Sequence, residues 1–209
     1  MKKISRKKHL EIKIQSLPPH PNPKVELEQY STPADIASDL LWNAKSLGDI
    51  ENKYILDLGC GCGIFTIGSM LLGAKSACGI DIDNDSIDVA ISNMNKLHID
   101  NIEFKVDDVL SLSNDFTVNT IFQNPPFGSQ ERSDSGIDLK FVKKSVELSP
   151  DVLYSFHMAS TEDFLIDYYE NLSMEITHIF RYDFNIPKIY NFHTKESKEV
   201  PVIVLRAIL

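Results

Sequence analysis

Short apolar runs alternate with helix-forming segments along most of this 209-residue chain, and this alternation limits the possible folds more than any other feature. The runs that we interpret as strands are residues 54–58, 76–82, 102–106, 120–123 and 152–156. Segments with a helical pattern follow four of them, at residues 63–72, 85–97, 138–148 and 161–172. Because parallel strands need crossover connections, this order predicts an α/β fold with a parallel sheet covered on both faces.

The two ends of the chain extend this plan. Residues 174–182 and 200–209 indicate two strands without a helix of ordinary length between them, so we expect them to pair antiparallel. Thr32 and Pro33 are typical of the start of a helix, with Thr32 as its N-cap, and Gly48 is typical of its end. We therefore predict a basic N-terminal extension at residues 1–26 and one domain at residues 27–209. Its sheet should be seven-stranded and mostly parallel, with one antiparallel strand.

Composition narrows the class of protein. With 43% hydrophobic and 24% charged residues, the chain resembles an ordinary globular domain. It has no apolar run of 18 residues and no signal-peptide pattern, so we expect a cytoplasmic protein without membrane spans. Cys60, Cys62 and Cys78 lack the spacing of a zinc site, so we expect no metal.

Charge is distributed unevenly along the chain. The net charge of −9 argues against binding nucleic acid by attraction to the whole surface. Residues 1–13, however, contain six Lys and Arg against one Glu. This basic arm is either a phosphate-contacting tail or a frayed, solubilising terminus.

Residues Asn124-Pro125-Pro126-Phe127 follow the fourth predicted strand and form a corner with few hydrogen-bond donors. Each proline fixes φ and lacks an N–H, and Asn124, which precedes a proline, is held extended. The corner therefore offers carbonyl oxygens, one carboxamide and one aromatic ring. Such oxygens accept hydrogen bonds from an NH₂ group while a ring stacks on its plane. We interpret the corner as a site that grips a planar group carrying an amine.

A glycine-rich turn follows the first predicted strand, in the order Asp57-Leu58-Gly59-Cys60-Gly61-Cys62-Gly63. Alternating glycines allow a ligand to approach the backbone closely. The turn departs from the dinucleotide-binding fingerprint, because Ile64 occupies the position of its last glycine. It resembles motif I of Rossmann-like S-adenosylmethionine (SAM) methyltransferases instead.

Two carboxylates end the next strands, at the sheet edge where ligands bind. Asp81 is placed to accept hydrogen bonds from the ribose hydroxyls of SAM, which leaves the capping of the next helix to Asp83 or Asn84. Asp108 is placed to accept from the adenine amine, near the N–H of Val109, although an ordinary loop role fits its position equally well.

The order of motifs points to one family. Glu28-Gln29-Tyr30-Ser31-Thr32-Pro33 resembles motif X of amino-methyltransferases, and motif X, motif I and Asn-Pro-Pro-Phe follow in the order of one class of adenine-N6 methyltransferases. The other matching segments are Gly79-Ile80-Asp81-Ile82-Asp83, Tyr154-Ser155-Phe156-His157 and Phe192-His193. From about Leu27 onward the chain resembles the methyltransferase-like protein 5 family, archaeal and eukaryotic enzymes that methylate adenine N6 in small-subunit ribosomal RNA. The resemblance implies the Rossmann-like fold of class I SAM-dependent methyltransferases.

This resemblance also implies roles for individual residues. The implied cofactor contacts are Gln29, Tyr30, Thr32, Asp57, Gly59, Cys60, Gly61, Asp81, Ile82, Asp108, Val109 and Asn124. The implied catalytic element is Asn124, Pro125, Pro126 and Phe127, and the implied RNA contacts are Phe127, His193 and Lys195. Hydrogen bonds from the amine to Asn124 and the Pro125 carbonyl favour a pyramidal nitrogen, so no general base is needed. A lone histidine such as His157 is more often structural.

The third predicted strand is a candidate site for a partner chain. The strand at 102–106 should lie at a sheet edge, and its alternating Ile102, Phe104 and Val106 invite pairing with another chain, although Lys105 also fits a protected edge. The resemblance implies that this partner is a small zinc-ribbon activator subunit.

One alternative function is that of a protein glutamine-N5 methyltransferase, but such enzymes usually carry Tyr where Phe127 stands and have a separate recognition domain. The other is a non-catalytic scaffold, against which the intact glycines, Asp81 and Asn124 count.

Overall fold

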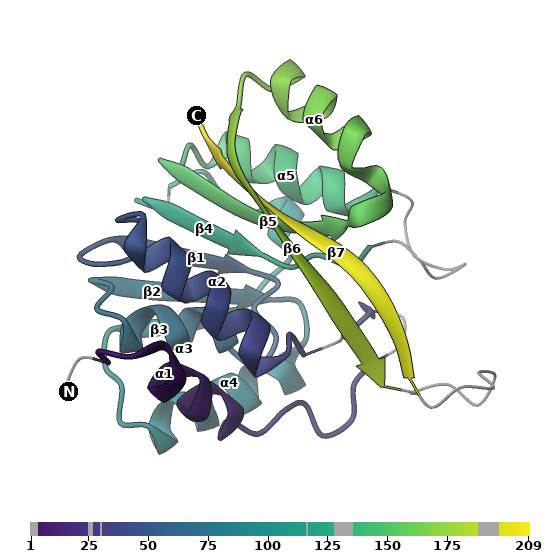
Figure 1. Cartoon of the computed structure of the whole chain (residues 1–209). Coiled ribbons are helices and arrows are strands. Elements are labelled where there is room, and N and C mark those ends of the chain that lie inside the picture. Colours follow the sequence, from purple (N-terminus) through teal and green to yellow (C-terminus); the bar gives the residue numbers. More distant parts are fainter. Residues whose placement is uncertain (1–3, 25–26, 30, 116, 128–135, 188–196) are drawn as a thin grey trace.

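The computed structural model describes residues 4–24, 27–29, 31–115, 117–127, 136–187 and 197–209. Its strands are β1 (Tyr54–Leu58), β2 (Ser76–Asp81), β3 (Ile102–Val106), β4 (Thr120–Gln123), β5 (Val152–Met158), β6 (Glu175–Pro187) and β7 (Ser197–Ile208). They form one sheet in the order β3-β2-β1-β4-β5-β7-β6 (Figure 1). Strands β1 to β5 are parallel, and β7 is antiparallel to both of its neighbours, β5 and β6. The predicted sheet is confirmed.

Helices cover both faces of this sheet. They are α1 (Lys7–Gln15), α2 (Ala34–Ser46), α3 (Ile64–Leu71), α4 (Asn84–Lys96), α5 (Ile137–Glu147) and α6 (Glu162–Asn171), with short 3₁₀ turns η2 (Val109–Ser111) and η3 (Ala159–Thr161). Helices α1, α2 and α3 share a core with Ile55 and Phe122, whereas α5 and α6 pack on the other face with Leu56 and Ile121 (Figure 1). Neighbouring strand residues thus enter opposite cores, which is why the strands read as continuous apolar runs. Among the described residues, no helix has the length and apolarity that crossing a membrane requires.

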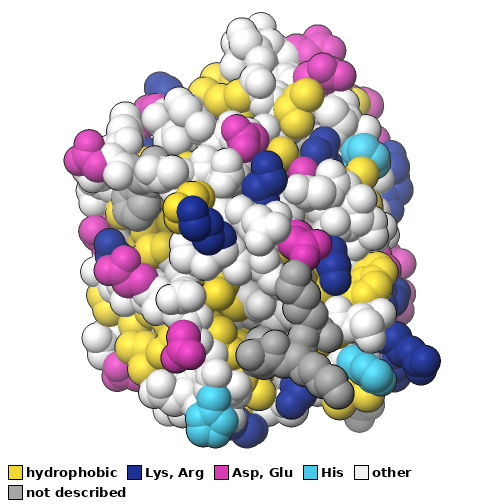
Figure 2. All heavy atoms as spheres, turned by 90° about the vertical axis from the view of Figure 1, so that its left-hand side faces the viewer, with side chains coloured by type: hydrophobic (Ala, Val, Ile, Leu, Met, Phe, Trp, Pro, Cys, Tyr) yellow, Lys and Arg dark blue, Asp and Glu magenta, His cyan; other side chains and the backbone are white. Residues whose placement is uncertain are grey.

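Part of the basic N-terminal arm is a packed helix. Leu10 and Ile14 of α1 are buried in the same core as α2 and α3. Lys7 and Lys8 donate to Asp39 and Glu11, both at 2.7 Å. Residues 7–15 are therefore not a frayed terminus, and two of their cations already have carboxylate partners. On the face shown in Figure 2, acidic and basic side chains are interspersed, and neither sign forms a continuous patch.

The start of α2 differs from the sequence prediction. Pro33, and not Thr32, is the N-cap residue, and the helix begins at Ala34. The Thr32 hydroxyl accepts a hydrogen bond from the Asn124 carboxamide at 3.1 Å. A tertiary partner has therefore replaced the local cap that the Thr-Pro pair predicted.

Strand β3 lies at the sheet edge as expected, but its Phe104 faces the interior of the domain. An added Cβ at Gly79 would lie 2.7 Å from Phe104 Cδ1, and one at Gly63 would lie 2.8 Å from its Cζ. The aromatic ring therefore packs over two glycines next to the glycine-rich turn. Phe104 is unsuited to probing the edge, because changing it would disturb this turn.

We expect Gly79→Ala to lower the free energy of unfolding by about 1–3 kcal/mol, because an added methyl group would press on the Phe104 ring and overpack this region. Urea denaturation of the purified protein measures this effect. Ser76→Ala, on the same strand but half-exposed, should stay within about 0.5 kcal/mol of the wild type and serves as the control. Equal stability of the Gly79 variant and the wild type would contradict the packing described here.

Candidate active site

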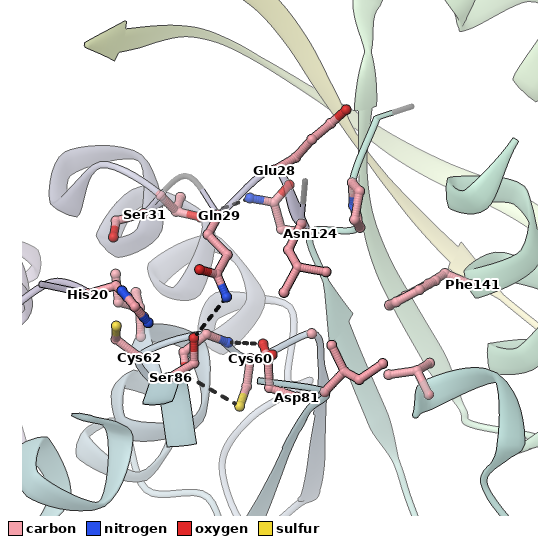
Figure 3. Close-up of a pocket in the computed structure, with 18 of the residues that line it drawn as sticks. His20, Glu28, Gln29, Ser31, Cys60, Cys62, Asp81, Ser86, Asn124 and Phe141 are labelled. Atoms are coloured by element: carbon pink, nitrogen blue, oxygen red, sulfur yellow. Dashed lines mark hydrogen bonds between the residues drawn. The ribbon is translucent and has the colours of Figure 1, made fainter. Parts of the chain in front are cut away.

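A cavity of about 330 Å³ lies at the carboxyl ends of β1, β2 and β4 (Figure 3). Leu58, at the end of β1, pairs with both Ile80 and Gln123, so the ends of the three strands are adjacent. This is the edge of a parallel sheet at which ligands bind. The sequence-predicted site residues that line the cavity are Gln29, Thr32, Gly59, Cys60, Gly61, Asp81, Ile82, Asp108, Val109, Asn124 and Pro126.

The remaining predicted residues are placed differently. Pro125 and Phe127 are not among the described residues that line the cavity, and Phe127 packs partly against the core that contains α2 and α3. Tyr30, His193 and Lys195 lie outside the described residues. The roles assigned to these three residues therefore stay predictions.

Asp57 lies beneath the glycine-rich turn and not on the cavity wall. Its Oδ2 accepts the Thr66 N–H at 2.9 Å and the Thr66 hydroxyl at 2.6 Å. Burial raises the pKa of Asp57 to about 7, although both bonds from Thr66 oppose the shift. Asp57 thus connects the end of β1 to the first turn of α3. It would affect a bound ligand only indirectly, by fixing the conformation of the glycine-rich turn between them.

The turn itself is held by Asp81. The Gly61 N–H donates to Asp81 Oδ2 at 2.8 Å (Figure 3), and the Asp83 N–H donates to Oδ1 at 2.9 Å. Burial raises the pKa of Asp81, against the effect of these two N–H groups. Each oxygen keeps capacity for a second donor. Gly61 has a φ of +50°, and an added Cβ there would meet no protein atom within 4 Å, so this side of the turn is open to a ligand.

The segment that precedes α2 closes one side of the cavity by binding Asp83. Gln29 Nε2 lies 2.7 Å and His20 Nε2 lies 3.2 Å from Asp83 Oδ2, and Lys24 donates to Oδ1. Burial alone would raise the pKa of Asp83, but the bonds from Lys24 and Gln29 hold it well below its usual range. Asp83 also caps α4, as one of the two predicted capping residues.

Sequence reasoning missed His20 and Glu28 as residues of this cavity. His20 lies 63 positions before its partner Asp83, so no local spacing marks it. Glu28 stands inside the recognised motif X, but the motif assigned it no role. Both side chains line the cavity (Figure 3).

Asp108 caps a short helical turn and also lies at the cavity. Its Oδ1 accepts the Leu110 N–H at 2.9 Å and thereby caps η2. It also lines the cavity together with Val109 and Leu110. Capping therefore does not remove this carboxylate from the site.

The Asn124 corner is oriented from both sides. Asn124 Nδ2 donates to the Thr32 hydroxyl at 3.1 Å, which leaves Oδ1 as an acceptor. Gln123, directly before it, is fully buried, donates to Ser155 Oγ at 2.8 Å and accepts from Ser145 Oγ at 2.7 Å. The strand end that carries the carboxamide is thereby held in place.

His157 belongs to the buried support of this corner. It is fully buried, and its Nε2 lies 2.8 Å from Ser155 Oγ and 3.1 Å from the Tyr169 hydroxyl. Its Nδ1 lies 3.1 Å from Asp138 at the start of α5. The side chain does not reach the cavity, which fits the structural interpretation of this histidine.

Comparisons with known proteins agree with this geometry. Residues 30–150 match the family described as the methyltransferase small domain. The chain is 42% identical to the uncharacterized protein MJ0284 of Methanocaldococcus jannaschii, over 96% of this chain and 93% of that protein. It is 34% identical to the rRNA N(6)-adenosine-methyltransferase METTL5 of Danio rerio, over 95% of this chain and 97% of that protein.

A solved structure has the same fold over nearly its whole length. PH1948 of Pyrococcus horikoshii, described as a candidate RNA methyltransferase, is 36% identical, with a TM-score of 0.87 and 98% of each chain covered. Together with the strand order, this similarity confirms the Rossmann-like fold of class I SAM-dependent methyltransferases.

Proposed function

Because this chain belongs to the methyltransferase-like protein 5 family of SAM-dependent methyltransferases, we propose that it methylates N6 of an adenine in RNA, with small-subunit ribosomal RNA as its substrate. The observation that carries the proposal is the hydrogen bond from Asn124 to Thr32. It directs the amide oxygen away from Thr32, in a corner whose two prolines offer no competing donors. An amine is the group that such a set of acceptors binds.

The chemistry of the cavity fits SAM. The described residues that line it include the carboxylates of Asp81 and Asp108 but no Lys or Arg, and the Glu28 carboxylate there accepts the Phe127 N–H. Carboxylates repel a pyrophosphate, whereas they stabilise a sulfonium cation. Asp81 would accept hydrogen bonds from the ribose hydroxyls of SAM, and Asp108 would accept one from its adenine amine.

The residues of the corner would then position the target base. SAM supplies a methyl group activated by its positive sulfur. Asn124 Oδ1 and the Pro125 carbonyl would accept hydrogen bonds from the two N–H groups of the target amine, and Phe127 would stack on the base. The amine nitrogen would take the methyl group from SAM, which would leave as a neutral thioether, and one amine proton would pass to water. Since an adenine must leave its stack to reach this corner, a single-stranded or bulged site is the expected substrate.

The direct test is mass spectrometry of nucleosides from ribosomal RNA incubated with the purified protein and SAM. The expected product is N6-methyladenosine in the small-subunit RNA, and the same nucleoside should be missing in a strain that lacks the gene. A release-factor-type protein in a parallel reaction tests the glutamine-N5 alternative. If that protein is methylated and the RNA is left unmodified, the proposed function is wrong and the chain is a protein glutamine-N5 methyltransferase.

We also propose a small zinc-ribbon activator subunit as a partner at the edge of β3. The Asp107 N–H donates to the Asp81 carbonyl of β2, so the preceding residue, Val106, directs its N–H outward. The Val106 side chain is 49% exposed. In the part of the chain that the structure describes, no strand pairs with this outer side of β3. An added strand from a partner could bind there.

Val106→Pro is expected to weaken co-purification with the zinc-ribbon subunit at least about tenfold, because it removes an outward N–H without breaking the ladder to β2. Val106→Thr keeps the N–H and the shape of the side chain, so it is the matched control. Association and RNA methylation are measured for both variants. If the Pro variant binds the subunit like the wild type, or if the protein alone reaches the full rate, the proposed edge pairing is wrong.

A further inference from the structure

Glu28 has an unusual backbone conformation at the wall of the cavity. Its φ is +48°, in the left-handed region that side-chain-bearing residues rarely adopt, and the residue is buried. Such a conformation persists only where the surrounding structure enforces it, and it is concentrated at functional sites. The observation therefore raises the question of what the Glu28 side chain does.

The Glu28 carboxylate binds the catalytic corner. Its Oε2 accepts the Phe127 N–H at 2.7 Å. Pro125 and Pro126 have no N–H, so the donor on Phe127 is the first one after Asn124 along the chain. A donor of this kind must be paired when it is withdrawn from water.

Thr32, four residues after Glu28, holds the other end of the same corner through Asn124. One short segment, residues 28–32, thus binds the corner at two points, one beside the amide and one beside the aromatic residue. Figure 3 shows Glu28 and Asn124 on one side of the cavity, opposite Asp81. Gln29 in the same segment contacts Asp83, which donates its N–H to Asp81. The segment therefore connects the two sides of the cavity.

We propose that Glu28 is a positioning residue for the target base. It sets the distance between the Phe127 ring and the Asn124 amide, so that the base is stacked while its amine is gripped. The role requires an acceptor oxygen at this place and does not require a negative charge. This inference rests on the proposed function, because it names a residue that serves the base-binding corner of the same site.

The test compares Glu28→Ala, Glu28→Gly and Glu28→Gln with the control Glu170→Ala, which changes an exposed glutamate on α6. For each variant, kcat and KM with ribosomal RNA, the Kd of SAM by calorimetry and the melting temperature are measured. We expect Ala and Gly to lower kcat at least about tenfold, because the partly buried Phe127 N–H loses its acceptor, while the Kd of SAM stays within about threefold. Gln keeps an acceptor oxygen and should restore kcat to within about threefold of the wild type.

The glycine variant separates positioning from a purely structural role. Glycine adopts a φ of +48° without strain, so Glu28→Gly should melt no lower than Glu28→Ala and still lose transfer. Wild-type kcat in the Ala and Gly variants would overturn the inference. So would a Gln variant as inactive as Ala, or a loss of kcat that only follows the loss of thermal stability. A wild-type protein that leaves RNA unmethylated would instead overturn the proposed function itself.

Discussion

Replacing Asn124 by alanine is expected to abolish methyl transfer, with a loss of at least about 100-fold in the single-turnover rate. The carboxamide oxygen, which Thr32 leaves available, is the acceptor placed to grip the reacting amine. SAM binding should change by less than about tenfold, because the ribose and adenine contacts assigned to Asp81 and Asp108 remain. Rapid-quench kinetics with ribosomal RNA and calorimetry with SAM measure the two effects separately.

Asn171→Ala provides the control for this experiment, because Asn171 is exposed on α6, far along the chain from the corner. Its transfer rate should equal that of the wild type. If Asn124→Ala keeps near-normal turnover, the amide does not grip the amine and the mechanism proposed here is incorrect. A large loss of SAM binding in this variant would instead assign Asn124 mainly to the cofactor.

Asp81→Ala should weaken SAM binding by about 1.5–3 kcal/mol, the usual range for hydrogen bonds to a charged group. Asp81 lies on the cavity wall with both oxygens able to accept a further donor, which suits the two ribose hydroxyls. Calorimetric titration with SAM gives the change in Kd directly. Asp88→Ala, at an exposed position on α4, is the matched control and should bind SAM normally.

The Asp81 variant also tests the second role of this carboxylate. Asp81 accepts the N–H groups of Gly61 and Asp83, so its loss also loosens the glycine-rich turn. Thermal melting without SAM measures that structural part. An unchanged Kd with a lowered melting temperature would mean that Asp81 holds the turn and does not bind the ribose.

The sequence by itself determined the sheet and the approximate position of the site. Strand and helix periodicities are local properties, and the crossovers between parallel strands place Gly61, Asp81 and Asn124 at one edge whatever the details of packing. For the same reason, the predicted element boundaries lie within a few residues of those observed for β1 to β5 and for α3 to α6. The glycine-rich turn, Asp81 and the Asn124 corner lie at this edge and carry part of the family resemblance, so the site was recognisable before any contact was known.

Only the tertiary structure decided which side chains meet at that edge. Thr32 could have capped α2, but its hydroxyl binds Asn124, 92 positions away in the chain. Glu28 reaches Phe127 over 99 positions, and His20 reaches Asp83 over 63. Each of these polar groups has several possible partners nearby in sequence, and the free energy of burial selects the distant one once the chain has packed. Local sequence patterns cannot predict these partners, because the pairing depends on how the segment before α2 lies across the ends of the strands.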